Sequence, residues 1–270
     1  MTEPSKQPGP SIPKRFGKLL FGGWMTALAD IDRLMKIDFR TKYPQPFLAL
    51  LMFLIPAAAF WWIYVPVHEF FHVFGCWGGG GTVTQLDIDH LYGGALFARW
   101  IPFVSAGSEY AGRLSGFNPG SDSCYLLTDF GPFVLSLLFG VPLLRLALKR
   151  ESIALAGPGL ILAFAPVLNL LGDYYEMGSI IATRIVFAVL PGAGQWASME
   201  MLRSDDFIKL IRELGTNPAV ADPGWPAAVI TILLGAILAI LLAGFTYQAS
   251  HWLARLIIKD APPHTVDPAA

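Results

Sequence analysis

Five consecutive residues, His68-Glu69-Phe70-Phe71-His72, combine two imidazoles and a carboxylate at helical spacing. On a helix, side chains four residues apart project from one face, so His68 and His72 can bind one metal ion together. Glu69 lies beside them and can act on a metal-bound water. The structural alternative is a pair of helix-end histidines with a capping carboxylate. Ionisable groups are costly at membrane depth and usually have a function there, which favours the metal site.

The composition of the chain is that of a membrane protein. Of its 270 residues, 54% are hydrophobic and 14% are charged, whereas ordinary soluble domains carry about 25% charged residues. The net charge of −1 gives no indication of a nucleic-acid partner. We therefore expect an all-α polytopic membrane protein in contact with the lipid bilayer.

Long apolar stretches predict about four transmembrane helices, over residues 47–67, 131–148, 153–172 and 227–249. Residues 179–193 are apolar but short and contain Arg184, which predicts a re-entrant or interfacial helix; if they span, the count becomes five and the C-terminus changes sides. The expected organisation begins with a cytoplasmic tail that includes an amphipathic interfacial helix (1–45), followed by a three-helix core that carries the motif (46–178). Next comes a re-entrant or interfacial segment (179–224), which includes a surface helix over 204–215. The last transmembrane helix (225–259) and a disordered tail (260–270) complete the chain.

The segment over 77–124 is expected to be a small β-containing loop region after the first span. Residues 82–88 roughly alternate and residues 95–101 have β-propensity, so a small sheet or hairpin is predicted, whose edge could pair with an extended peptide. Cys76 and Cys124 flank this segment. They form a disulfide if it faces an oxidising compartment, or remain two free thiols; Cys76 is also a spare metal ligand.

Two further segments are interpreted from their periodicity. Residues 14–37 place Trp24, Leu28 and Ile31 at helical spacing, with Asp30 among the residues available for the polar side. This helix lies at the membrane interface or packs on the body of the protein. In the last span, Gly235, Ala239 and Ala243 form a stripe of small residues suited to close helix packing.

Lysine and arginine favour the cytoplasmic side of a membrane. They gather before the first span, after the second and after the last (Arg33, Lys36, Arg40, Lys42; Arg145, Lys149, Arg150; Arg255, Lys259). This predicts a multi-pass protein of a bacterial-type inner membrane with both termini inside and the 77–124 loop outside.

A zinc hydrolase site needs a third protein ligand and one open position for water. Nearly equal numbers of residues separate Phe47 from His68 and Ile153 from Asp173. At about 1.5 Å per residue, both stretches end roughly 30 Å from the same membrane face. Because these two helices run parallel, Asp173 arrives level with the motif. Glu176, one turn further on, is the rival ligand or an outer partner of the site.

The predicted chemistry is hydrolysis of a peptide bond. Zinc lowers the pKa of its bound water towards about 7, and Glu69 accepts the proton and passes it to the leaving amine. Asn169, one turn before Asp173, could hydrogen-bond a substrate backbone or a ligand, or else only a neighbouring helix.

The motif in the first span, Asp173 in the third, and the Gly-rich, strand-like segment between them resemble the site-2 protease family of intramembrane zinc metalloproteases. The resemblance implies that His68, His72 and Asp173 bind one zinc ion, that Glu69 is the catalytic base, and that the substrates are membrane-anchored proteins. The family's Leu-Asp-Gly is replaced here by Gly172-Asp173-Tyr174.

Two other classes of function remain as alternatives. The first is a non-catalytic membrane scaffold, or a protein with a structural metal that keeps the protease fold; the presence of Glu69 counts against it, because a structural site does not need that residue. The second is a transporter or metal-handling protein. The small number of intramembrane charges and the lack of an obvious inverted repeat in the sequence argue against it.

Overall fold

The computed structural model describes residues 12–36, 44–190, 207–213 and 225–258. The described residues are mostly helical, with one small three-stranded sheet, which is consistent with the expected helical membrane protein. The tail at 260–270, which was predicted to be disordered, lies outside the described residues. The first helix begins at Ile12.

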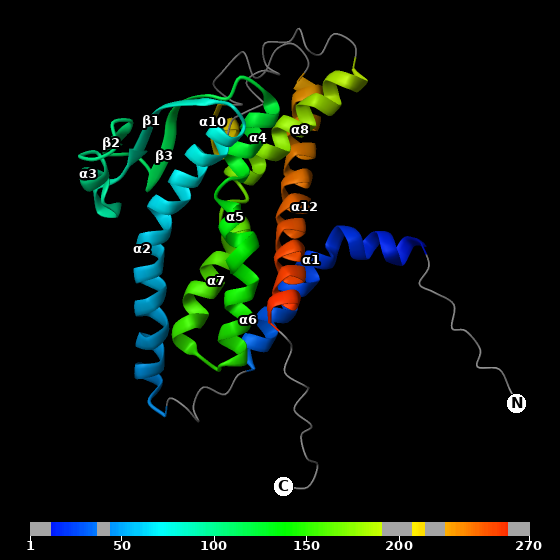
Figure 1. Ribbon diagram of the computed structural model, residues 1–270. Helices are drawn as coiled ribbons and strands as arrows, with labels where there is room; N and C mark the ends of the chain where they lie inside the picture. Colours follow the sequence, from blue (N-terminus) through cyan, green and yellow to red (C-terminus); the bar gives the residue numbers. More distant parts are fainter. Residues whose placement is uncertain (1–11, 37–43, 191–206, 214–224, 259–270) are drawn as a thin grey trace, which may run out of the picture.

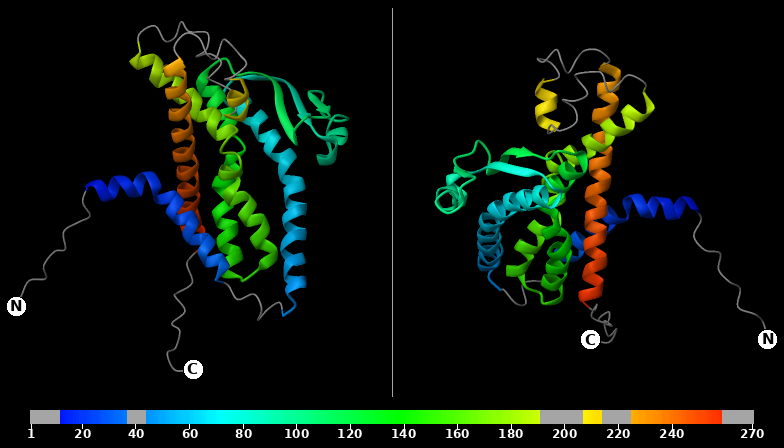
Figure 2. Two further views of the ribbon diagram at one scale, coloured as in Figure 1. Left: turned by 180° about the vertical axis from the view of Figure 1, so that it is seen from behind. Right: turned by 45° about the horizontal axis from the view of Figure 1, so that its top comes forward.

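Among the described residues, three helical stretches are long and apolar enough to cross a membrane: Pro46–Gly78, Ile153–Val189 and Ala228–Ile257. A fourth is formed if the bent pair Asp122–Phe130 and Phe133–Lys149, which meet at 55°, is one span. The four predicted spans therefore match the upper end of this count. In Figures 1 and 2 the spanning helices lie side by side along one direction, with the sheet near one end.

Helix α2 (Pro46–Gly78) carries the motif and is longer than the predicted span at 47–67, continuing to Gly78. Its first half is apolar all round, as expected for a helix in contact with lipid. Pro66 lies inside it and cannot donate the helical hydrogen bond, which favours a bend. Figure 1 shows α2 leaning towards the bundle over its second half, which carries the motif inward.

The second span, predicted over 131–148, is observed as three pieces, namely α5 (Phe133–Leu135), the π-helical turn η2 (Ser136–Gly140) and α6 (Val141–Lys149). Another helix, α4 (Asp122–Phe130), precedes it. A hydroxyl on another helix forms hydrogen bonds with two backbone groups at the π-helical turn. Ser250 Oγ accepts from the Val141 amide at 3.1 Å and donates to the Ser136 carbonyl at 2.9 Å. Such compensation is what an irregular turn at membrane depth needs.

Helices α7 (Ile153–Leu168) and α8 (Asp173–Val189) follow one another with a break at 169–172. Residues 179–189, predicted as a re-entrant or interfacial helix over 179–193, continue α8, and α7 and α8 together are long and apolar enough for one span. Arg184, which argued against a span, forms an ion pair with Asp122 of α4. A partner distant in sequence thus compensates its charge.

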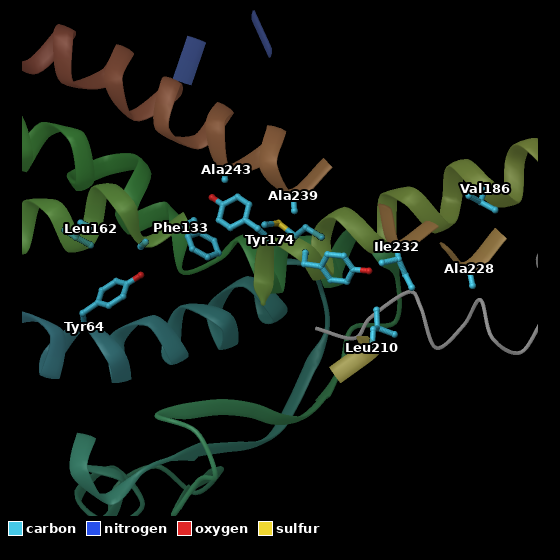
Figure 3. Packing of buried hydrophobic residues seen from close by; sticks show 13 residues of the cluster. Tyr64, Phe133, Leu162, Tyr174, Val186, Leu210, Ala228, Ile232, Ala239 and Ala243 are labelled. Carbon is cyan, nitrogen blue, oxygen red and sulfur yellow. The ribbon is translucent and has the colours of Figure 1, made fainter. Parts of the chain in front are cut away.

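Helix α12 (Trp225–Ile257) packs along α8 through small residues, as the stripe in the sequence predicts. A Cβ at Gly178 would overlap the carbonyl oxygen of Gly235, and Ala239 and Ala243 are buried. The backbones of α8 and α12 therefore approach closely, and Figure 3 shows this contact beside the buried Tyr174.

Helix α1 (Ile12–Met35) packs against α12, with the Trp24 indole donating to the Ile240 carbonyl at 3.0 Å. Asp30 was predicted for the polar side of this helix, and this is wrong. It is fully buried and accepts a hydrogen bond from the Tyr247 hydroxyl at 3.1 Å. Leu28, placed on the apolar side, is exposed. The contacts with α12 show that this helix packs on the body of the protein.

The sheet has the order β2-β1-β3, with β1 (Thr82–Ile88) parallel to β2 (Val104–Ala106) and antiparallel to β3 (Gly112–Asn118). The sheet over 77–124 was expected, but the strand predicted at 95–101 is wrong. That stretch begins inside α3 (Gly94–Phe97), which follows the short 3-10 helix η1 (His90–Tyr92). The Phe97 ring packs edge-on against Phe70 of α2, 5.4 Å between centroids, and this contact is made from a helical turn.

The surface helix predicted at 204–215 is observed over its described part as α10 (Phe207–Glu213). Leu210 is fully buried, and the Phe207 ring lies 5.2 Å from that of Tyr175. The main core continues from there through Phe133, Tyr174 and Tyr64 towards α7 (Figure 3). α10 therefore packs onto the core through Phe207 and Leu210.

Candidate metal centre

The two histidines of the motif and Asp173 lie together in the structure. His68 and His72 are buried on α2, and Asp173 is the first residue of α8. One side-chain atom from each of the three lies within 4.8 Å of the other two. His68 Nε2 is 3.3 Å from Asp173 Oδ2, and His72 Nε2 is 3.7 Å from Asp173 Oδ1.

These distances suit a small tetrahedral ion. Zinc bonds of about 2.0–2.2 Å to nitrogen and oxygen place neighbouring ligands about 3.3–3.5 Å apart. Asp173 Oδ2 is buried and has no hydrogen-bond partner among the described residues, although an unsatisfied buried carboxylate oxygen is expensive. The donor set, its spacing and this unsatisfied oxygen therefore fit a zinc ion.

The tautomer of His72 is fixed by a backbone carbonyl. His72 Nδ1 lies 2.8 Å from the Thr128 carbonyl oxygen, which only accepts, so Nδ1 carries the proton. The lone pair is then on Nε2, which faces Asp173. This is the outer partner that metal-binding histidines usually have.

The Thr128 carbonyl is available for His72 because of a proline. In a helix this oxygen would accept from the amide four residues on, but that residue is Pro132, which has no N–H. Gly131 allows α2 and α4 to approach, since a Cβ there would overlap the Phe71 carbonyl oxygen. Gly131-Pro132 thus both brings α4 against the motif and frees the acceptor.

His68 has an outer partner on its own helix. Its Nδ1 lies 3.1 Å from the hydroxyl of Tyr64, one turn earlier. With a metal on Nε2, Nδ1 carries the proton and donates to the tyrosine oxygen. The Phe133 ring packs edge-on against His68, 5.8 Å between centroids, and so closes the apolar side of the site.

Glu69 is buried beside the three candidate ligands and interacts electrostatically with His72 and Asp173. The backbone of β3 lies directly on it. A Cβ at Gly112 would overlap Glu69 Cγ and lie 2.8 Å from Cδ. The absence of a side chain at Gly112 therefore lets the strand run against the carboxylate.

The remaining residues singled out from the sequence have other partners. Glu176 accepts a hydrogen bond from the Tyr125 hydroxyl at 3.1 Å and is not in the three-residue group. Asn169 donates to the Ala165 carbonyl of its own helix at 3.0 Å, and among the described residues it has no hydrogen bond to the site or to a neighbouring helix. Cys76 and Cys124 are buried and are not joined by a disulfide in the structure, and Cys76 is not in the group either.

Sequence reasoning missed three contributors to the site. Thr128 acts through its carbonyl oxygen, and the signal for it was the proline four residues later. Tyr64 lies one turn before His68 at the spacing that places it on the same face. Gly112 had no visible signal, because its role depends on where β3 lies relative to α2.

A groove of about 1030 Å³ lies along the bundle beside the residues that precede the motif on α2. Most of its lining is apolar and comes from α2, from α5 to α6, and from Leu162 of α7, and Lys149 and Arg150 lie at its far end. Tyr64, the outer partner of His68, is part of the lining. The candidate site is therefore next to a space that an apolar segment can occupy.

Comparisons with protein-family models, curated proteins and solved structures found no match for this chain.

Proposed function

We propose that this protein is a zinc-dependent metalloprotease that hydrolyses a peptide bond of a membrane protein, within or beside the bilayer. The observation that supports it most strongly is the set of His68, His72 and Asp173 from two helices with Glu69 beside them. A structural metal site requires the ligands alone; the buried carboxylate of Glu69 is what a hydrolytic site adds.

The residues divide into holding and reacting groups. His68, His72 and Asp173 hold the metal, and the Thr128 carbonyl and the Tyr64 hydroxyl orient the two imidazoles. Zinc, when bound, supplies Lewis acidity that activates water and polarises a carbonyl. Glu69 accepts a proton from the attacking water and delivers it to the nitrogen of the leaving amine.

The surroundings of Glu69 support an extended peptide as substrate. β1 lies between β2 and β3, so β3 is an edge strand of the sheet. Its first residue, Gly112, contacts Glu69. A substrate strand that pairs with this edge is held by main-chain hydrogen bonds, which leaves its sequence free and places a peptide bond near the carboxylate.

The apolar groove supports a membrane-embedded substrate. It reaches Tyr64 from the end of the bundle that carries Lys149 and Arg150. A transmembrane helix that enters it has to unwind at the site, because a protease acts on an extended peptide. We further propose that the basic ends of α6 and α12 face the cytoplasm, which places the metal centre towards the opposite membrane face.

The test is a comparison of wild type with Glu69→Gln, both purified in detergent and incubated with a panel of single-span membrane proteins. We expect one zinc ion per chain in both proteins and cleavage by wild type alone. Zinc in both without cleavage of any substrate would favour the structural-metal alternative. Folded wild-type protein without metal would rule out the proposal.

A further inference from the structure

A second cavity, of about 580 Å³, lies between α1, α6 and α12, apart from the metal centre. Its volume is in the usual range for a small-molecule site. The charged and titratable side chains that line it are Asp30 and Arg33 of α1, Arg145 of α6, and His251 and Arg255 of α12. The proposed protease chemistry uses none of them.

The lining of this cavity is strongly cationic. Asp30 is the one acidic residue among the described residues that line it, and it faces Arg33 Nη1 at 3.3 Å and Arg145 Nη2 at 3.8 Å. Its second oxygen accepts from the Tyr247 hydroxyl. The lining of the cavity therefore carries one carboxylate and three guanidinium groups.

His251 does not change this balance. Arg145 Nη2 lies 2.8 Å from His251 Nδ1, and a guanidinium only donates. Nδ1 therefore carries a lone pair, so this imidazole is neutral and its proton is on Nε2. The cavity keeps a net positive charge and offers guanidinium and imidazole donors, the groups that bind phosphate well.

The rim of the cavity is apolar and exposed. Phe21, Met25 and Trp252 line it and are 54%, 65% and 59% exposed. Arg255 lies one turn after His251 on α12, beyond the uncharged part of the last span, where headgroups are expected. Cationic groups inside and apolar side chains outside match the two parts of a lipid molecule.

We propose that this cavity binds the phosphate of an anionic glycerophospholipid, whose acyl chains lie along the exposed rim. A net negative lipid is favoured over a zwitterionic one, because a choline or ethanolamine cation would meet the same guanidinium groups. The bound lipid would connect α1 to α6 and α12. This proposal does not depend on the proposed protease activity.

The experiment is native mass spectrometry of the full-length protein in nonionic detergent, titrated with phosphatidylglycerol or with phosphatidylcholine of the same acyl chains. We expect the phosphatidylglycerol adduct to be preferred. Arg33→Gln/Arg255→Gln should lower its affinity by about tenfold, since hydrogen bonds to charged groups are lost. Lys36→Gln/Lys149→Gln is the matched control, because it removes the same charge from residues that do not line this cavity.

Each result decides for or against the site. Selective binding that only the cavity variant loses, and that also occurs in Glu69→Gln, supports it. Equal binding of both lipids, or an equal loss in the control variant, would overturn it in favour of unspecific attraction. Displacement of the lipid by equimolar inorganic phosphate at constant ionic strength would also overturn it, because a soluble phosphoryl compound would then be the ligand.

Discussion

The tautomer of the His72 imidazole at the candidate site follows from a residue that is not its hydrogen-bond partner. Pro132 has no amide hydrogen, so the Thr128 carbonyl is left to accept from His72 Nδ1, and the ring presents Nε2 to Asp173. Metal sites depend on such outer partners nearly as much as on the ligands. At the scale of the residue, the identity of each ligand and of each partner can be tested separately.

The two carboxylates at the start of α8 should differ in their effect on zinc. Asp173→Asn is expected to lower zinc affinity by more than about 100-fold, since loss of an outer partner alone costs about 10–100-fold. Glu176→Gln should leave it unchanged, because the amide oxygen of glutamine still accepts from Tyr125. Competition with a chromogenic chelator measures both. The opposite order would make Glu176 the third ligand.

The hydroxyl of Tyr64 should matter for the metal although it does not touch it. Tyr64→Phe removes the partner of His68 Nδ1 and is expected to lower zinc affinity about 10–100-fold. Tyr175→Phe is the control, since its buried hydroxyl has no hydrogen-bond partner among the described residues. Equal affinities of the two variants, measured by chelator competition, would show that Tyr64 does not support His68.

At the scale of the element, β3 packs against α2, and at Gly112 its backbone lies against Glu69. Gly112→Ala is expected to displace the carboxylate and to lower the rate of cleavage strongly, with zinc retained. Overpacking of this kind also costs about 1–3 kcal/mol of stability. Cleavage assays, zinc content and thermal unfolding of the same preparation separate these effects.

Gly116 of the same strand provides the matched control. A Cβ there would lie 2.6 Å from Thr84 Oγ1 of β1, so Gly116→Ala overpacks the sheet without meeting Glu69. It should lose similar stability and keep a higher rate of cleavage than Gly112→Ala. If both variants lose activity in parallel with stability, β3 has no positioning effect on Glu69.

The elements show which parts of the structure the sequence could predict. Helical rise is regular, so counting residues along two parallel spans was enough to bring Asp173 level with His68. Local patterns could not show that Asp30 meets Tyr247, or that Arg184 meets Asp122, because these partners are distant in sequence. The β-propensity around Phe97 was overridden in the same way, by its packing on Phe70.

At the scale of the whole molecule, charge and topology should agree. One end of the bundle carries the start of α2, the turn between α6 and α7, and the end of α12 (Figures 1 and 2). The sheet and α4 lie towards the opposite end. Basic residues gather at the first of these ends, among them Lys36, Lys149 and Arg255. Under the proposed orientation, with the basic end in the cytoplasm, the sheet and the metal centre lie towards the opposite membrane face.

Labelling of single introduced cysteines tests this arrangement, since Cys76 and Cys124 are buried and contribute little background. We expect a membrane-impermeant thiol reagent to label Glu109→Cys in intact cells, and to label Lys36→Cys and Glu151→Cys only after the membrane is opened. Labelling of both Glu109→Cys and Glu151→Cys in intact cells would mean that α4 to α6 do not cross. The reversed pattern would keep the spans and invert the protein, so that the zinc site would face the cytoplasm and the basic ends would contradict the charge rule.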